Sequence, residues 1–580
     1  MDLSVATELE NSNSIIPIDE HFKLYAGPGA GKTTFLTNHI KRILHQSTKL
    51  GKAKKIACIT YTNTAVNTLV NKLEDSIESL EICTIHSFCY KHIVKPYIWI
   101  LEDSPLPIDK IDGHEQIKLR HSQINQLKIE IGQNYLNDVK LCEALNKLQW
   151  VLDDEIPTLK FLNAYDGKIE GYFLKKSAYY KYKQLYWSEG KLSHDDVLYF
   201  AYKILQENIR IIDIIRAKFP YILIDEFQDT SPLQTAIIEL IGQKEVNIGV
   251  IGDLCQSIYS FQGANVESFE MFSIENMKLY ILKDNHRSSN EIINVLNHMR
   301  KNKDFEQSSP THKSGNLPTI LVGSKKSAYH YLNDKSINPV VLSYKSENSK
   351  SVEYETDLIE DMDFNIILQD SNNERGWRIF HIIQSIELAK QFQLKEALRL
   401  MKIAYRKDEP FTDKEAFVNL KRFLNMYNEF ETKSITYFHN ELIVGQYNVK
   451  GRISRGAAKT LYDGLTYRKV ALQMKILDDL SDFKTIHQSK GDEFENILVI
   501  IPPQKQGTEL NFLLSPNMNI EVHRVYYVAL SRAISGLYIN VESLKEQEKA
   551  ALIEIGFEVI QVDQSNELNI TTTKELVKSL

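Results

Sequence analysis

A glycine-rich segment near the N-terminus has the residue types and spacing of a phosphate-binding loop. The segment comprises Ala26, Gly27, Pro28, Gly29, Ala30, Gly31, Lys32 and Thr33. An apolar run precedes it and a helical apolar pattern follows it, which is the strand–loop–helix order that such a loop requires. Glycines let backbone N–H groups approach phosphate oxygens, and a helix N-terminus favours negative charge. We expect Lys32 to reach the β- and γ-phosphates and Thr33 to hold Mg²⁺.

A pair of adjacent acids, Asp225 and Glu226, follows the apolar run at residues 221–224. Such a run is typical of a buried parallel strand. The carboxyl ends of parallel strands are where α/β proteins bind ligands. We therefore expect Asp225 to help hold Mg²⁺ and Glu226 to orient and activate the attacking water. Two solvated acids would be the alternative for an isolated pair, but the phosphate loop upstream argues against it.

The composition is typical of a soluble globular protein and does not identify a binding partner. The 580 residues are 43% hydrophobic with a net charge of −7, which does not indicate nucleic-acid binding but leaves room for a local basic groove. Apolar runs are too short for a membrane span, and residues 1–20 lack the features of a signal peptide. We expect a cytoplasmic protein. Among the five cysteines, Cys83 and Cys89 flank His86, but three ligands make a poor zinc site and ordinary packing is favoured.

Apolar runs of strand length alternate with helical stretches, which predicts an α/β fold. The expected strands lie at residues 56–61, 221–224, 246–251, 279–282, 340–344, 497–501 and 537–541. Lysines and aromatic residues interleave at residues 175–187. They could line a nucleic-acid path, but an amphipathic helix with inward aromatics is the favoured reading.

Further segments lie between the loop and the acid pair and after them in a recognisable order, and the whole set resembles the superfamily 1 UvrD/Rep helicases. The resemblance runs from about residue 24 to residue 540. Its motifs lie at residues 26–33, 60–63, 84–88, 195–198, 225–230, 252–264, 285–288, 485–494 and 524–533.

The resemblance implies a role for individual residues. The catalytic set is Lys32, Asp225, Glu226, Gln256, Arg287 and Arg532. The nucleotide-binding set is the loop from Ala26 to Thr33 with Thr34, Gln228, His286 and Glu493. The DNA-binding set is Thr62, Asn63, Thr84, His86, Tyr259, Phe261 and His487. Arg287 and Arg532 would act as arginine fingers, Gln256 as the residue that senses the γ-phosphate, and Tyr259 and Phe261 as stacking platforms for bases.

The resemblance also implies an architecture of two RecA-like P-loop motor domains, each with a largely helical insertion. The expected bounds are 1–90 and 190–275 for the first motor, 91–189 for its insertion, 276–365 and 470–548 for the second motor, 366–469 for its short insertion and 549–580 for a tail. ATP would then lie between the motors, and closure would complete the catalytic site. The implied activity is ATP- and Mg²⁺-dependent movement along single-stranded DNA, 3′ to 5′, with unwinding at duplex junctions.

Several positions depart from the family pattern. No Gln precedes Gln46, Thr34 and His286 replace an Arg and a Tyr that clamp adenine, and Gln262 stands where an Arg is usual. The short second insertion and the abrupt N-terminus resemble the helicase-like subunit of the Gabija anti-phage system, which works with an OLD-type nuclease. The alternative function is therefore a DNA- and nucleotide-sensing subunit that activates a partner nuclease with little unwinding. DNA repair and antiviral defence both remain open as the biological role.

Overall fold

A computed structural model describes the chain except for residues 1–2, 103, 112, 115–116, 118, 120, 163–164, 243–245, 354–366, 368–369, 371, 406–410, 446–450, 474–480, 504–509 and 563–580. The chain forms two compact units. Unit 1 comprises Met1–Leu317 and Leu510–Ser535, and unit 2 comprises Pro318–Glu509 and Gly536–Leu580. Each unit contains a sheet with parallel strand pairs, so the expected α/β class is confirmed.

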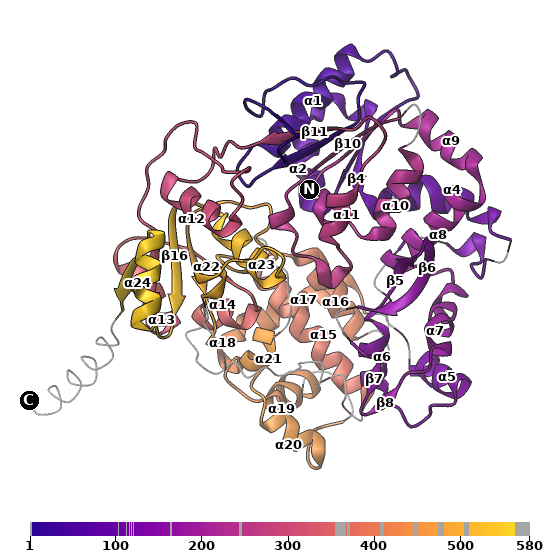
Figure 1. The fold of residues 1–580 in the computed structure, drawn as a ribbon. Coiled ribbons are helices and arrows are strands. Elements are labelled where there is room, and N and C mark those ends of the chain that lie inside the picture. The colour runs from indigo at the N-terminus through magenta and orange to yellow at the C-terminus, as the bar shows by residue number, and fades with distance from the viewer. Residues whose placement is uncertain are drawn as a thin grey trace, which may run out of the picture. The chain divides into compact units, whose positions relative to one another are not determined.

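The sheet of unit 1 has seven strands in the order β1-β11-β2-β10-β9-β3-β4. Figure 1 labels β4, β10 and β11 of this sheet. Its strands are β1 (Thr7–Glu8), β2 (Phe22–Ala26), β3 (Ile56–Thr60), β4 (Leu80–Thr84), β9 (Tyr221–Ile224), β10 (Asn247–Gly252) and β11 (Lys278–Leu282). Every neighbouring pair is parallel. All residues of β2, β3, β9 and β10 are buried, which explains why these strands read as continuous apolar runs.

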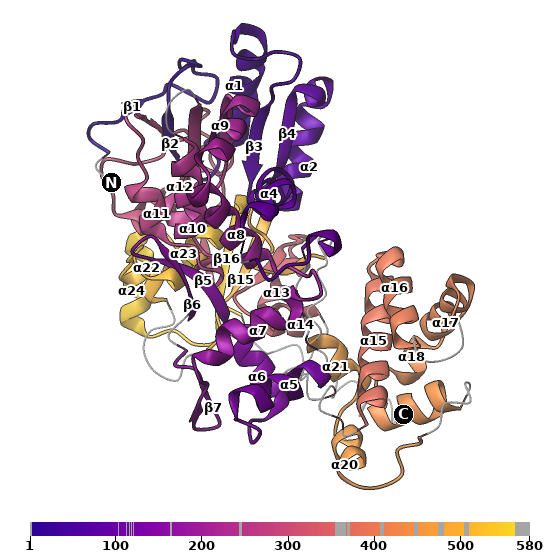
Figure 2. The same cartoon turned by 90° about the vertical axis from the view of Figure 1, so that its right-hand side faces the viewer.

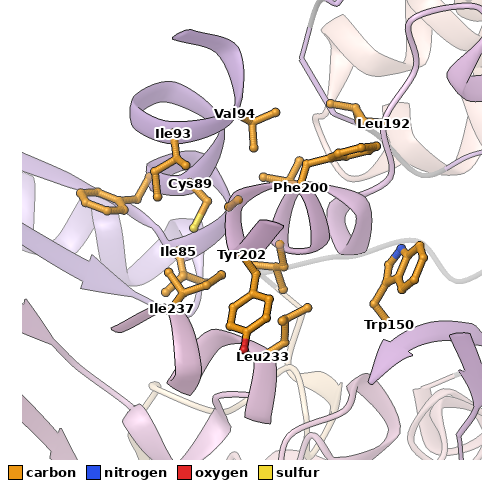
Figure 3. Close-up of a cluster of buried hydrophobic side chains, with 14 of the residues drawn as sticks. Ile85, Cys89, Ile93, Val94, Trp150, Leu192, Phe200, Tyr202, Leu233 and Ile237 are labelled. Carbon is orange, nitrogen blue, oxygen red and sulfur yellow. The ribbon is translucent and has the colours of Figure 1, made fainter. Parts of the chain in front are cut away.

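Several helices of unit 1 share apolar cores with the strands of this sheet, namely α1 (Lys32–Gln46), α2 (Asn63–Lys72), α3 (Ile85–Cys89), α8 (His194–Glu207), α9 (Ile209–Lys218), α10 (Pro232–Ile241) and α11 (Val266–Met271). Unit 1 also contains α12 (Asn290–Arg300), α22 (Asn511–Leu514) and α23 (Glu521–Leu530), which pack against one another. Figure 3 shows one buried cluster, where Ile85 and Cys89 of α3, Phe200 of α8 and Ile237 of α10 belong to the same core. Hydrophobic burial of this kind fixes the strand ends that carry the motifs.

Residues 91–189 are less uniformly helical than their pattern predicts. Besides α4 (Lys95–Tyr97), α5 (His121–Ile131), α6 (Asp138–Leu145) and α7 (Ser177–Trp187), they form two antiparallel hairpins, β5 (Leu148–Asp153) with β6 (Ile156–Phe161) and β7 (Lys168–Ile169) with β8 (Tyr172–Phe173) (Figure 2). The turn between β5 and β6 has positive φ at Asp154 and Glu155, 45° and 64°. Two-residue hairpin turns of this kind usually contain Asn-Gly or Asp-Gly, so the sequence gave little indication of this hairpin.

Helix α7 shows whether the aromatic side chains of the lysine-rich stretch at residues 175–187 are buried or exposed. Its Tyr182, Tyr186 and Trp187 side chains are buried in the core of unit 1, and Lys183 is buried against Asp196. The amphipathic-helix interpretation is therefore confirmed for these aromatic residues.

The sheet of unit 2 has six strands in the order β14-β13-β15-β16-β12-β17. The strands are β12 (Thr319–Val322), β13 (Val340–Ser343), β14 (Phe483–Thr485), β15 (Phe494–Ile500), β16 (Ala533–Val541) and β17 (Glu558–Gln561). Helices of unit 2 are α13 (Lys325–Asp334), α14 (Ser346–Glu353), α15 (Asn373–Lys390), α16 (Leu394–Ala404), α17 (Asp413–Asn425), α18 (Tyr427–Phe430), α19 (Ile435–Tyr437), α20 (Ala457–Asp463), α21 (Tyr467–Gln473) and α24 (Glu546–Ile555). Helices α15 to α21 pack around their own apolar core, as expected for a helical segment there.

Each strand predicted from the sequence is present in one of the two sheets, within a few residues of its expected bounds. The domain boundaries themselves stay a prediction.

Candidate functional site

Three segments of unit 1 meet at one edge of its sheet. Strand β10 pairs with β2 so that Gly252 lies opposite Tyr25, and with β9 so that Val250 lies opposite Ile224. The phosphate loop after β2, the acid pair after β9 and the segment after β10 therefore leave the sheet side by side. This edge is formed by the carboxyl ends of parallel strands, where ligands bind in open α/β sheets.

The phosphate loop has the backbone conformation that its glycines permit. Gly29 and Gly31 have φ of 69° and 83°, a region where residues with a Cβ are strained. Gly31 then caps α1, and Lys32 begins that helix. The Lys32 ammonium donates to the Ala26 carbonyl at 3.4 Å, which holds it over the loop. The conformation fits the phosphate role expected of this segment.

Residues on both sides of α12 lie directly against the phosphate loop. The His286 N–H donates to the Gly29 carbonyl at 2.9 Å. The Gln307 carboxamide donates to the Pro28 and Asp284 carbonyls, at 3.0 Å each, and is buried against Gly27. His286, expected beside the base, is thus near the loop, while Gln307 was not expected there at all.

The N-terminal segment also reaches the loop. Ser12 lies so close to Gly31 that a Cβ there would be 2.7 Å from the Ser12 Cβ. The Asn13 side chain accepts a hydrogen bond from Asn38 of α1 at 2.9 Å. Polar side chains from this segment therefore stand beside the start of α1, although no Gln precedes Gln46.

The acid pair is held by hydrogen bonds at the end of β9. Asp225 is 8% exposed, and one of its carboxylate oxygens accepts the Glu226 N–H at 2.9 Å. Glu226 adopts a left-handed backbone, with φ of 53°, where the chain turns away from the strand. Its carboxylate accepts a hydrogen bond from the Gln228 Nε2 at 2.5 Å. Oxygen ligands such as the Thr33 hydroxyl and the Asp225 carboxylate suit Mg²⁺.

Gln228 connects the acid pair to the segment after β10. It is fully buried, and its Oε1 accepts the Asp253 N–H at 3.0 Å. A Cβ on Gly252 would lie 2.5 Å from that same Oε1, so only glycine allows this approach. Asp253 in turn accepts a hydrogen bond from the Gln256 Nε2 at 2.7 Å. One line of hydrogen bonds, which passes through the backbone N–H of Asp253, thus runs from Glu226 to Gln256.

Arg532 extends this line of hydrogen bonds beyond Gln256. Its Nη2 donates to the Gln256 Oε1 at 3.2 Å and to the Ser531 hydroxyl at 2.8 Å. Arg287 donates to the Ser531 carbonyl at 2.9 Å, so both arginines meet at Ser531. Both belong to unit 1, the unit that also contains the phosphate loop. The structure therefore brings the two expected arginine fingers, Gln256, Gln228 and Glu226 into one connected set.

Aromatic side chains gather beside this set. Tyr61 stacks on Tyr259 with ring centroids 4.7 Å apart, and Tyr259 packs against Phe261 at 5.9 Å. Tyr259 is largely buried, whereas Phe261 is 44% exposed. The Tyr61 hydroxyl donates to Gln262 at 2.5 Å. Of the two expected stacking residues, Phe261 has the exposure that stacking on a base needs.

The short polar residues expected to contact DNA are used as helix caps. The Thr62 hydroxyl accepts the Ala65 N–H at the start of α2, and the Thr84 hydroxyl accepts the Ser87 N–H at the start of α3. Burial, with help from two neighbouring histidines, lowers the pKa of His86 to about 3, so its imidazole is neutral at pH 7. The side chain of Asn63 lies outside the described part of the structure.

The remaining expected residues belong to unit 2. His487 is half-buried with its ring 5.8 Å from that of Tyr344, and Glu493 is exposed just before β15. The segment between β14 and β15 is held by Gln488, whose Oε1 accepts from the Thr485 N–H at 2.9 Å and the Thr485 hydroxyl at 3.0 Å. These contacts order the segment without assigning it a ligand.

Two residues next to the site had no signal in the sequence. Gln307 and Arg300 lie outside every motif and are brought to the loop and to Asp253 by tertiary contacts. Among the described residues, no group of three or more His, Cys, Asp or Glu side chains is arranged to hold a metal ion. No helix in the described part is long and apolar enough to span a membrane.

Comparison with known proteins matches residues 8–278 to the UvrD/REP helicase N-terminal domain. The chain is 26% identical over 498 residues to a probable DNA helicase II homolog of Mycoplasma capricolum, covering 82% of this chain and 63% of that protein. It is 29% identical over 296 residues to the ATP-dependent DNA helicase Rep of Buchnera aphidicola, and 26% identical over 302 residues to the ATP-dependent DNA helicase PcrA of Staphylococcus aureus. These two matches cover 48% and 50% of this chain but 40% of each relative. These matches show that the chain is similar to the UvrD/Rep-type helicases and that its residues 8–278 resemble their N-terminal domain.

Proposed function

We propose that the protein is an ATP-dependent DNA helicase of the UvrD type, which couples ATP hydrolysis to movement along single-stranded DNA. The observation that carries the proposal is the connected line from Glu226 through Gln228, Asp253 and Gln256 to Arg532. It joins the carboxylate suited to water activation with the positive charge suited to a leaving γ-phosphate. The matched family and relatives support this assignment.

Each part of the site would have its own role in hydrolysis. The phosphate loop and Lys32 would bind the triphosphate, and Thr33 and Asp225 would hold Mg²⁺, which neutralises charge on the phosphates when bound. Glu226 would orient the water and accept its proton. Arg287 and Arg532 would stabilise the negative charge of the transition state. His286, Thr34 and Glu493 would lie around the base and ribose.

DNA binding would use stacking and phosphate contacts. Phe261, with Tyr259 beneath it, would support a base, which is worth about 1–3 kcal/mol per base by alanine substitution. The segments at Thr62, Thr84, His86 and His487 would contact the backbone, which carries no sequence information. We propose 3′-to-5′ movement along single strands, with unwinding at duplex junctions, by likeness to the family.

A second candidate is a DNA-sensing subunit that hydrolyses ATP, unwinds little and activates a partner nuclease. Gln262 favours it, because this neutral residue stands where relatives carry an Arg and is engaged by Tyr61. A relation to the Gabija system and a partner nuclease of the OLD type belong to this candidate. Copurification from native cells tests the nuclease partner directly.

The test measures hydrolysis and strand displacement by the purified chain. ATP turnover should rise on adding single-stranded DNA, and Lys32→Ala and Glu226→Gln should abolish that turnover. Lys41→Ala, which changes an exposed lysine of the same helix α1, is the matched control and should behave as wild type. Duplexes with a 3′ or a 5′ single-stranded tail then report direction. Stimulated hydrolysis without displacement of either duplex would favour the sensing subunit, and unstimulated hydrolysis would contradict both candidates.

A further inference from the structure

Arg300 ends α12 as a buried cation that contacts three separate elements of unit 1. Its side chain is 2% exposed. The Nε donates to the Tyr527 hydroxyl at 2.6 Å, the Nη1 donates to the Tyr25 hydroxyl at 3.2 Å, and the Nη2 donates to the Asp253 carboxylate. The guanidinium also lies 4.6 Å from the ring centroid of Phe305. Each of its three nitrogens is therefore used.

The partners of Arg300 all belong to segments of the candidate site. Tyr25 precedes the phosphate loop on β2, Tyr527 lies on α23 five residues before Arg532, and Asp253 follows β10. Burial by itself would lower the pKa of Arg300, but Asp253 and the neighbouring tyrosines raise it well above its usual range. The group therefore stays charged, and Asp253 is its buried counterion.

The Asp253 carboxylate contacts both Arg300 and Gln256, while its Oδ1 accepts the Cys255 N–H at 3.1 Å. The same carboxylate oxygen, Oδ2, accepts both from the Arg300 Nη2 and from the Gln256 Nε2, the latter at 2.7 Å. This fixes which end of the Gln256 amide faces Asp253, so that the Oε1 points to Arg532. A turned amide would place two donors against each other and lose the contact with Arg532.

We propose that Arg300 is a positioning residue for the coupling of DNA binding to hydrolysis, acting through Asp253 on Gln256 and hence on Arg532. The proposal rests on the proposed function of this site. Arg300 touches none of the groups that would react, so its effect should appear in turnover rather than in nucleotide affinity. The planar fork of arginine makes three directed hydrogen bonds, which lysine cannot reproduce although it keeps the charge.

The experiment combines Arg300→Lys with Gln256→Ala in the full-length chain. Basal and DNA-stimulated kcat, KM for ATP, Kd for a fluorescent ATP analogue and Tm are measured for wild type, both single variants and the double variant. Arg216→Lys is the matched control, because Arg216 is also buried but donates to the carbonyls of Leu240 and Ile241, away from the site. It should lower Tm while keeping the ratio of stimulated to basal kcat.

We expect Arg300→Lys to reduce DNA-stimulated kcat about tenfold or more while nucleotide Kd stays within about twofold. In the Gln256→Ala background the same change should have little further effect, because residues acting through one another are not additive. An unchanged stimulation ratio in Arg300→Lys, or fully additive losses in the double variant, would overturn the proposal. Loss of Tm alone, as in Arg216→Lys, would also overturn it. Absence of DNA stimulation in wild type would instead contradict the proposed function.

Discussion

Replacing Gln228 tests whether the buried amide orients the carboxylate that would activate water. Its Nε2 donates to Glu226 at 2.5 Å, and its Oε1 accepts the Asp253 N–H at 3.0 Å. Gln228→Glu keeps the shape and the acceptor but replaces the donor with a carboxylate. The change therefore removes the hydrogen bond to Glu226 and sets two like charges side by side, whereas the bond to Asp253 can persist.

The expected loss follows from the bond that disappears. A hydrogen bond to a charged group contributes about 1.5–3 kcal/mol. If Glu226 needs that bond to hold its productive orientation, the barrier rises by a similar amount and kcat falls by roughly ten- to a hundredfold. Gln228→Ala should lose as much turnover and also stability, because the buried Asp253 N–H is left without its partner at a cost of about 1–3 kcal/mol.

The assay is steady-state ATP hydrolysis at saturating single-stranded DNA, with nucleotide Kd and Tm measured in parallel. Gln133→Ala is the matched control, since Gln133 is also buried and bonds to backbone groups of Phe173 and Lys175, away from the site. It should lower Tm but keep kcat. The reasoning is refuted if Gln228→Glu turns over within about threefold of wild type, which would mean that the amide does not orient Glu226.

Three further predictions address stacking, charge and base selection. Phe261→Ala should weaken single-strand binding and DNA stimulation but spare basal hydrolysis, and an unchanged stimulation curve would exclude the stacking role. Arg287→Ala and Arg532→Ala should each lower kcat by orders of magnitude with nucleotide Kd within about tenfold, since such charges act mainly in the transition state; parallel loss of binding would make them ground-state anchors. With Thr34 and His286 in place of the usual clamp, kcat/KM for GTP should lie within about tenfold of that for ATP, and a preference above about a hundredfold would assign base reading to another segment.

If ATP is strongly preferred over GTP, the N-terminal segment is the first candidate for the part of the chain that contacts the base. Ser12 lies against Gly31 and Asn13 is bonded to Asn38, so polar groups from the N-terminal segment stand beside the start of α1. A preference for ATP would direct mutagenesis to these positions first. Relaxed selectivity would instead show that they only pack against the loop.

The local sequence determined those parts of the protein whose chemistry is contiguous in the chain. The phosphate loop and the acid pair each follow a buried strand directly, so that apolar runs and turn residues located both. Strands such as β9 and β10 were predictable for the same reason, because burial on two faces makes them apolar throughout. Strands β1, β4, β12, β14 and β17 were not predicted. The hairpin of β5 and β6 was not predicted from the sequence, because Asp154 and Glu155 are an unusual pair for its turn.

Tertiary structure alone decided which side chains meet. Arg532 and Gln256 are 276 positions apart, and Arg300 and Asp253 are 47 apart, so no periodicity or spacing could pair them. The hydroxyls of Thr62 and Thr84, which are expected to contact DNA, also cap helices in this structure, because backbone N–H groups at helix starts need an acceptor. Sequence motifs identify residues that can take part in chemistry. Only the packing of strands and helices brings a distant cation to a buried carboxylate and fixes the orientation of that cation.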